Sequence, residues 1–430
     1  MFWGAFDMEK ILIKNARVMD PSQNLDMVAD ILLENGVIAK VGEGIEAEAT
    51  VIDATGLVAA PGLIDMHVHL RDPGFTHKED ILTGCMAAAA GGFTAVASMP
   101  NTKPVTDSPE IIKYILDKAK DAACRVYPVA AITKDLSGSA LNDFAALKAA
   151  GAVGVSDDGR PVEKGGQMLE ALKLAQQEGL LALSHCEDLT IIDGGIINKG
   201  KISEELGVKG MDRASEDSIT AREIVLAECS DTRIHICHVS TKGSVQLIRE
   251  AKARGVKVTA ETAPHYMLMT DELLRAKDAN WRMNPPLREQ EDCEAVIAGV
   301  LDGTLDCIIT DHAPHAAEEK ADFYKAPNGI VGLETSFAAA NTALCKGRGM
   351  DLMKLIDMMS CRPAQILGVP GGTLKIGEAA DIVLLDPDKV WTVDKTKFHS
   401  KSNNTPFHGM ELTGKAVCTI CGGKITYQNI

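Results

Sequence analysis

Strand-like and helix-like runs alternate eight times through the middle of the chain, and this constrains the fold more than any other sequence feature. The strand-like runs are short and apolar, whereas the stretches between them are amphipathic or rich in alanine. Such alternation indicates parallel β/α units. The strand-like runs cover residues 63–70, 94–100, 125–132, 152–159, 180–186, 233–240, 256–262 and 306–312.

Eight such units predict an α/β protein with a TIM-type (β/α)8 barrel as its main domain, over residues 61–368. An open doubly wound sheet is the alternative, but its first strand is usually followed by a glycine-rich phosphate loop. Here the first strand ends in HVHLRDPG. Residues 1–60 and 369–430 both show short β-rich runs broken by glycine and asparagine. We expect them to form one small β-sandwich domain, because neither end has enough strands to be stable alone.

Composition excludes several classes of partner. The net charge of −16 argues against nucleic acid and anionic membranes, which both require a basic surface. No apolar run approaches the ~20 residues needed to span a bilayer. The start, MFWGAFDMEKILIKN, lacks the features of a signal peptide. Eleven scattered cysteines are typical of free thiols in a reducing compartment. We therefore expect a cytoplasmic protein, and a homodimer because symmetric dimers are the commonest oligomers.

Histidine and aspartate residues gather at the C-terminal ends of the strand-like runs, which open onto one face of a barrel. His67 and His69 are the strongest signal, because a two-residue spacing places both on the same side of a strand. A lone strand-end histidine is more often a hydrogen-bonded core residue, and Asp-Asp-Gly is a common turn sequence. However, five of the eight runs carry such residues, which favours a divalent metal such as Zn²⁺. The set is His67, His69, Asp157, Asp158, His185, His238 and Asp311.

Two further histidines are given no metal role. His235 lies three residues before His238, and His312 follows Asp311 directly. Strand alternation places both on the other face from their neighbours.

These segments resemble the dihydroorotases of the amidohydrolase superfamily. Residues 65–74, DMHVHLRDPG, are similar to the first signature of that family. Residues 310–315, TDHAPH, with Lys320 five residues on, are similar to the second. Between them MPNT, SDDG, SHCED, CHVST, ETAPHY, MNPPLR and GIVGLET follow in the same order, so the resemblance covers essentially the whole chain.

The resemblance implies two zinc ions. One would be held by His67, His69 and Asp311, and the other by His185 and His238. Many members of the superfamily bridge the two metals with a carboxylated lysine, but this chain has Asp157-Asp158 there and no lysine until Lys164. The pattern is similar to that of bacterial dihydroorotases with an aspartate bridge. We assign the bridge to Asp158, because Asp157 would alternate to the other face.

The resemblance also implies an activity: reversible cyclisation of N-carbamoyl-L-aspartate to (S)-dihydroorotate and water, in de novo pyrimidine biosynthesis. Metal-activated hydroxide would attack the ring carbonyl, with Asp311 as general base and then acid. Arg71 offers a planar fork suited to the substrate carboxylate. The family pattern adds His69, Asn101, Asn284, His315 and backbone groups near Asn328 and Gly329. Asn328 departs from the pattern, since phenylalanine is frequent there in relatives.

Two other functions remain open at this point. The first is another cyclic amidohydrolase, such as a hydantoinase or allantoinase, although these usually keep the lysine bridge. The second is a non-catalytic scaffold, since some dihydroorotase-like chains lose their ligands and serve only in complexes with aspartate transcarbamoylase. All six expected ligands are present here, which argues against a scaffold. A complex with aspartate transcarbamoylase remains possible for an active enzyme.

Overall fold

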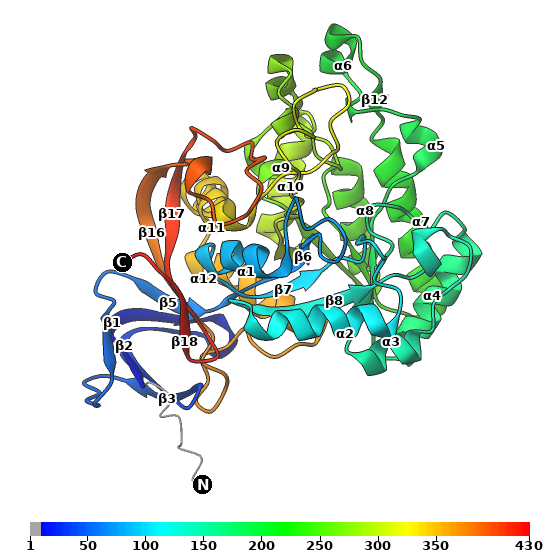
Figure 1. Ribbon diagram of the computed structural model, residues 1–430. Helices are drawn as coiled ribbons and strands as arrows, with labels where there is room; N and C mark the ends of the chain where they lie inside the picture. The colour runs from blue at the N-terminus through cyan, green and yellow to red at the C-terminus, as the bar shows by residue number, and fades with distance from the viewer. Residues whose placement is uncertain (1–9) are drawn as a thin grey trace.

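The computed structural model describes residues 10–430 as a barrel and a separate sheet (Figure 1). Residues 1–9 lie outside the described residues, as does most of the segment on which the signal-peptide prediction depends. Within residues 10–430, no helix combines the length and the hydrophobicity that crossing a membrane requires.

The barrel contains the eight strands that the alternation predicts. They pair in parallel in the order β15-β14-β13-β10-β9-β8-β7-β6, and a bridge between Val68 and His312 brings the two ends of this sheet together. The regular strands are shorter than the predicted runs, partly because His238 and Asp311 adopt positive φ angles that end the strand conformation. The strands are β6 (Leu63–Val68), β7 (Phe93–Ser98), β8 (Arg125–Ala130), β9 (Gly154–Val155), β10 (Leu181–Ser184), β13 (Ile234–Ile236), β14 (Val258–Thr262) and β15 (Cys307–Ile308).

Helices surround the barrel, and the longer ones bury apolar residues against it. In α2, for example, Ile112 and Ile115 are buried, whereas Lys113 is exposed. Asp80 begins α1 with a capping box to Thr83. The helices are α1 (Ile81–Ala90), α2 (Pro109–Lys118), α3 (Phe144–Ala150), α4 (Gly165–Gln177), α5 (Leu189–Ile192), α6 (Lys201–Leu206), α7 (Ala214–Ser230), α8 (Lys242–Ala253), α9 (His265–Leu268), α10 (Gln290–Asp302), α11 (Ser336–Ala340), α12 (Leu352–Ile356) and α13 (Arg362–Leu367). A small parallel pair, β11 (Ile197–Asn198) and β12 (Gly210–Met211), lies in the loop before α7.

The separate sheet joins both ends of the chain, as predicted. Its order is β18-β17-β16-β5-β1-β2-β3, and β4 pairs with β1. The halves meet where β5 runs antiparallel to β16, with Pro61 opposite Ile382. The strands are β1 (Ile11–Asp20), β2 (Leu25–Glu34), β3 (Val37–Gly42), β4 (Thr50–Asp53), β5 (Val58–Pro61), β16 (Ile382–Thr392), β17 (Glu411–Cys421) and β18 (Lys424–Gln428). The exact domain boundaries at 60/61 and 368/369 stay a prediction.

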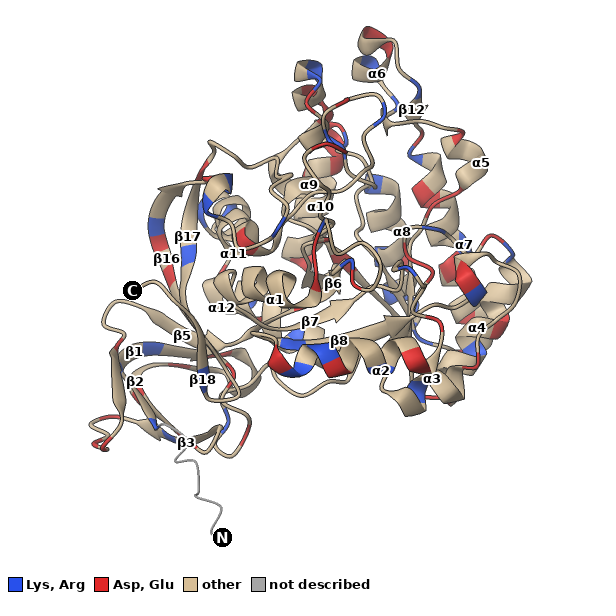
Figure 2. Cartoon of the chain, in the orientation of Figure 1, with Lys and Arg blue, Asp and Glu red and all other residues tan. Residues whose placement is uncertain are grey.

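Charged residues of both signs are interspersed along the helices and loops (Figure 2). Acidic residues outnumber basic ones, 60 to 44. The most informative charges are the few that lie buried at the C-terminal ends of the barrel strands, such as Asp158, Asp311 and Arg71.

Candidate active site

A pocket of about 220 Å³ opens at the C-terminal ends of the barrel strands. Of the site residues expected from the sequence, all line it except Asp157 and His67, and His67 is fully buried. The lining residues are His69, Arg71, Asn101, Asp158, Gly159, His185, His238, Asn284, Asp311, Ala313, His315, Asn328 and Gly329. Residues from all parts of the barrel sequence thus meet in one place.

Asp158 stands among four imidazoles. Its Oδ1 lies 3.2 Å from Nε2 of His67, 3.5 Å from Nδ1 of His185 and 3.5 Å from Nε2 of His238. Its Oδ2 lies 3.4 Å from Nε2 of His69. Burial by itself raises the pKa of Asp158, but the facing histidines hold it well below its usual value. The carboxylate is therefore ionised at neutral pH.

Asp157 points elsewhere. Its carboxylate accepts hydrogen bonds from the backbone N–H of Thr133, at 2.9 Å, and from the Thr133 hydroxyl. The structure thus separates the two aspartates, with only Asp158 on the side of the histidines, although both lie beyond the end of β9 and not within the strand.

The donor atoms in the pocket suit metal ions. His67, His69 and Asp158 form one group of three, and Asp158, His185 and His238 form another, each with its ligand atoms within 4.8 Å of one another. Among the described residues, Nε2 of His67 and Oδ1 of Asp158 are buried without a hydrogen-bond partner. Buried polar atoms without partners are costly, and a cation would satisfy both. Two triads that share one carboxylate fit a two-metal site.

Hydrogen bonds orient three of the four histidines. Nδ1 of His67 lies 2.7 Å from Oε1 of Glu261, and Nε2 of His185 lies 3.1 Å from Oε2 of Glu187. Nδ1 of His69 lies 2.8 Å from the amide oxygen of Asn101. Each acceptor favours an N–H on that side of the ring, so the other nitrogen is the one that would bind a metal.

Sequence reasoning missed Glu187 and Glu261. Both stand at or just after the C-terminal end of a barrel strand, β10 and β14. The strand-end rule that selected the histidines would also have selected these carboxylates. His235, which was given no metal role, contacts the second carboxylate oxygen of Glu261 through Nε2 at 3.0 Å and does not line the pocket. His312 likewise does not line it, and its Nε2 faces Glu79 at 3.6 Å.

Asp311 approaches the histidine cluster from the other side. Its Oδ1 lies 3.2 Å from Nε2 of His69 and 3.8 Å from Nε2 of His67. Burial raises the pKa of Asp311, but His69 and the neighbouring histidines lower it below its ordinary value. Asp311 is therefore a buried, ionised carboxylate beside the expected ligands.

Arg71 is a buried cation at the edge of the same pocket. Its Nε donates to the carbonyl of Pro314 at 3.1 Å, and its Nη2 lies 3.4 Å from Nε2 of His315. Burial lowers the pKa of Arg71 to about 10, so it keeps its charge at neutral pH. A buried guanidinium in a pocket suits a carboxylate ligand.

Backbone strain concentrates at this site. Arg71, His238 and Asp311 have φ angles of 61°, 34° and 50°, in the left-handed region that residues with a side chain rarely adopt. Each such residue costs on the order of 1–3 kcal/mol unless its surroundings hold it in place. All three line the pocket, so the surrounding structure imposes the geometry of the side chains that face it.

The remaining expected residues contact one another around the pocket. Nδ2 of Asn284 donates to Oε1 of Glu187 at 3.0 Å. Nε2 of His315 lies 2.9 Å from the backbone oxygen of Asn328 and donates to it. Asn328 thus contacts His315 through its backbone, and its expected contact with the substrate stays a prediction.

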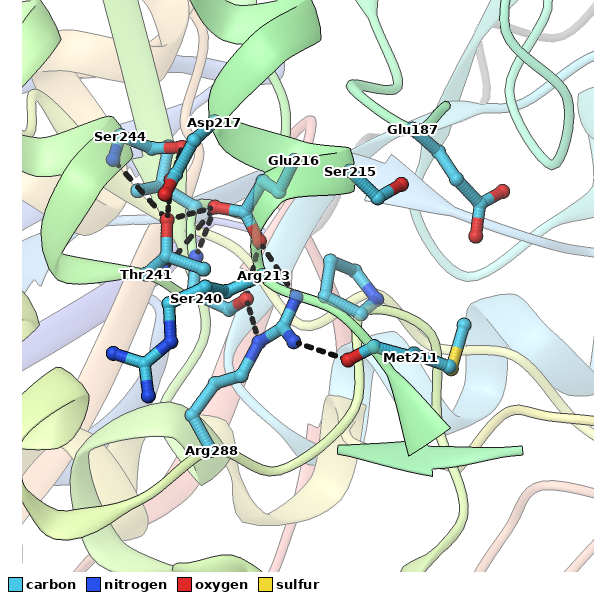
Figure 3. A network of polar contacts seen from close by, with 12 residues as sticks. Glu187, Met211, Arg213, Ser215, Glu216, Asp217, Ser240, Thr241, Ser244 and Arg288 are labelled. Carbon is cyan, nitrogen blue, oxygen red and sulfur yellow. Dashed lines mark hydrogen bonds and ion pairs between the residues drawn. The ribbon is translucent and has the colours of Figure 1, made fainter. Parts of the chain in front are cut away.

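A buried ion pair joins Glu216 of α7 to Arg288, and both residues also contact Ser240 (Figure 3). Glu216 accepts from the backbone N–H of Ser240 at 2.9 Å, and its Oε2 lies 3.4 Å from Nη2 of Arg288. Arg288 also donates to the Ser240 hydroxyl at 3.1 Å. Fully partnered buried charges of this kind specify one loop geometry.

Comparison with known proteins agrees with the geometry. The model of the family "Dihydro-orotase-like" matches residues 56–244, and that of "Amidohydrolase family" matches residues 238–427. The dihydroorotase of Geobacter metallireducens is 52% identical over 97% of this chain and 99% of its own length. That of Trichlorobacter lovleyi is 51% identical over the same shares.

Solved structures show the same architecture. The L-hydantoinase of Arthrobacter aurescens has a TM-score of 0.88 and 26% identity, covering 98% of this chain and 97% of its own. The dihydropyrimidinase of Brevibacillus agri has a TM-score of 0.86 and 26% identity, covering 98% and 95%. Both carry the name dihydropyrimidinase, but the dihydroorotases are about twice as similar to this chain in sequence. The chain belongs to the dihydroorotase family of amidohydrolases.

Proposed function

We propose that this protein is a zinc-dependent dihydroorotase, which interconverts N-carbamoyl-L-aspartate and (S)-dihydroorotate in pyrimidine biosynthesis. The observation that carries the proposal is a pair of ligand triads sharing Asp158, in a pocket that also holds the buried cation Arg71. The triads supply hydrolytic machinery, and Arg71 supplies a receptor for an anionic substrate. The identity of about 50% to dihydroorotases over nearly the whole chain supports the same activity.

Six side chains would hold two zinc ions. His67, His69 and Asp311 would bind one, His185 and His238 the other, and Asp158 would bridge them. The mixture of imidazole and carboxylate donors suits Zn²⁺. When bound, the two ions would polarise the ring carbonyl and lower the pKa of a water from 15.7 to about 7.

Asp311 carries the proton in this scheme. Its carboxylate is buried and ionised in the pocket, so it can accept a proton from the attacking water. It then donates that proton to the amide nitrogen as the ring opens. In the biosynthetic direction the same carboxylate removes the proton from the carbamoyl nitrogen as the ring closes and returns it to the oxygen that leaves as water.

Arg71 and its neighbours orient the substrate. The guanidinium would bind the carboxylate outside the reacting ring, with Asn101, Asn284 and His315 completing the polar lining. Burial and the cations Arg71, Lys78 and Lys320 lower the pKa of His315 to about 2, so its ring is neutral. A neutral His315 presents no further charge beside Arg71.

Metal analysis combined with a substrate comparison tests the proposal. The purified protein should contain about two zinc ions per chain and hydrolyse dihydroorotate, and chelation should abolish turnover until Zn²⁺ is restored. Dihydroorotate, hydantoin and allantoin should be assayed side by side. Faster turnover of hydantoin or allantoin would reject the dihydroorotase assignment, and metal-free protein would favour a scaffold.

The cellular setting is also part of the proposal. We place the enzyme in the cytoplasm, in line with its eleven free cysteines, all of which lie among the described residues. We expect a homodimer, because symmetric dimers are the commonest oligomers. An association with aspartate transcarbamoylase would connect consecutive reactions. Light scattering of the enzyme alone and with that partner tests both assemblies.

A further inference from the structure

The connection between β16 and β17, residues 393–410, leaves the terminal sheet and packs against the barrel. In Figure 1 it is the orange-red segment that extends from β16 and β17 toward α9 and α10. Phe407 is buried in a cluster with Met269, Met283 and Ile330 of the barrel. This anchoring brings Asn404, which is 3% exposed, to the pocket loops.

Both the oxygen and the nitrogen of the Asn404 side-chain amide form hydrogen bonds with two of those loops. Its Oδ1 accepts from the backbone N–H of His315 at 3.1 Å. Its Nδ2 donates to the carbonyls of Ala313 at 3.3 Å and Gly329 at 3.0 Å. The backbone oxygen of Asn404 accepts from Val331 N–H at 3.0 Å. One acceptor and two donors match one N–H and two carbonyls, a pattern that an asparagine supplies and an aspartate does not.

The Gly329 peptide is held from a second direction. Nζ of Lys320 is buried and donates to the carbonyls of Gly329 at 3.0 Å, Pro327 at 2.9 Å and Arg282 at 3.1 Å. Burial lowers the pKa of Lys320 to about 7, while three carbonyl acceptors favour its ammonium form. The carbonyl of Gly329 therefore receives two hydrogen bonds, from Asn404 and Lys320.

The loops that contain Ala313 and Gly329 pack closely against each other. Gly329 has a φ of +142°, and a Cβ there would lie 2.7 Å from the carbonyl of Ala313 and 2.9 Å from Nε2 of His315. Such a close approach requires that both loops keep their relative position. On the opposite side, Ala313, His315 and Gly329 line the substrate pocket. Arg71 depends on the same loop, because its Nε donates to the carbonyl of Pro314.

We propose that Asn404 is a positioning residue: it holds the 313–315 and 329 backbones so that Arg71, His315 and Gly329 form the receptor for the substrate carboxylate. The inference rests on the proposed dihydroorotase function. It makes a segment between two strands of the terminal sheet part of the active-site wall, although Asn404 itself does not line the pocket. Lys320 donates to the same Gly329 carbonyl and helps to hold the same loop in place.

Steady-state kinetics of Asn404→Ala and Asn404→Asp test this role. Removing the amide, or placing a carboxylate oxygen against two carbonyls, should raise KM for dihydroorotate about 10–100-fold, since small misplacements of binding groups cost up to that much. The kcat should stay within about threefold and the zinc content should not change, because no metal ligand contacts Asn404. Lys320→Met should raise KM in the same way, and it provides an independent variant if an Asn404 variant does not fold.

Asn341→Ala is the matched control. Asn341 is also buried, and its Nδ2 donates to two backbone carbonyls, of Pro387 at 2.9 Å and Thr413 at 2.8 Å, remote from the pocket. This variant should lose thermal stability and keep the wild-type KM.

The outcomes separate the two proposals. Folded Asn404 variants with unchanged KM, or an equal rise of KM in Asn341→Ala, would overturn the positioning role while the wild-type turnover still supports the proposed function. Absence of dihydroorotate turnover by the wild-type holoenzyme would refute the proposed function and this role together.

Discussion

Replacing Glu261 with glutamine probes how the metal site is held without removing any expected ligand. Glu261 lies on β14 with no solvent exposure, its Oε1 2.7 Å from Nδ1 of His67 and its Oε2 3.0 Å from Nε2 of His235. Burial raises the pKa of Glu261, but the two histidines hold it far below its usual value. Both carboxylate oxygens thus accept from imidazole N–H groups.

Glutamine has the same shape but only one acceptor oxygen. One of the two histidines must then face an NH2 group, to which an imidazole N–H cannot donate. If His67 responds by carrying its proton on Nε2, that nitrogen can no longer act as a metal ligand. Loss of such an orienting partner typically weakens metal binding 10–100-fold, which corresponds to about 1.4–2.8 kcal/mol.

Zinc affinity, measured by competition with a chromophoric chelator, gives the direct readout. We expect the half-saturating zinc concentration of Glu261→Gln to rise 10–100-fold, with much of the turnover restored at saturating zinc. Glu223→Gln is the control, because Glu223 is equally buried on α7 and accepts from the Ser184 hydroxyl at 3.3 Å without contacting a ligand histidine. An affinity within about twofold of wild type, or an equal loss in both variants, would refute the reasoning.

Three other predictions address the proton carrier, the anion receptor and the terminal sheet. Asp311→Asn should lower kcat by about 10²–10⁴ at full zinc occupancy, and more than a tenth of the wild-type rate would exclude the general-base role. Arg71→Lys should raise KM for dihydroorotate with little change in kcat, whereas an unchanged KM would count against carboxylate binding. Burial raises the pKa of Asp30, but Lys14, 2.6 Å away, and two backbone N–H groups lower it below its usual value. Its ionised form therefore stabilises the fold above the unfolded-state pKa of about 3.9, and this contribution is lost as the pH falls toward the lower folded-state pKa. Asp30→Asn should reduce the free energy of unfolding by about 1–3 kcal/mol at pH 7 and by less below pH 4, and urea titrations that show a pH-independent difference would contradict this.

The periodicity of the chain was sufficient to predict the barrel architecture. Eight apolar runs separated by helical stretches predicted the barrel, and each run overlaps one observed strand. The sequence also predicted that Asp158 and Asp157 face different sides, although both lie beyond the end of β9 and not within the strand. Runs were nevertheless longer than strands, since backbone turns at His238 and Asp311 are imposed by their surroundings.

Contacts between distant segments could not be predicted in this way. Glu261 and His67 are 194 residues apart, and nothing near Glu261 in the sequence indicates that it orients a histidine. Asn404 lies in a connection without periodicity, 75 residues from Gly329 and 89 from His315. Such pairs meet only after the barrel closes and the β16–β17 connection packs against it.

The sequence by itself therefore determined the strands of the barrel, their order along the chain and the residue types that gather at one end of it. These features depend on local periodicity and spacing. The tertiary structure decided how those residues face one another. Asp158 became the common member of two ligand triads, and Arg71, His238 and Asp311 were held in left-handed conformations. The physical reason is that hydrogen bonds and burial supplied by distant segments offset the strain and desolvation that these positions cost.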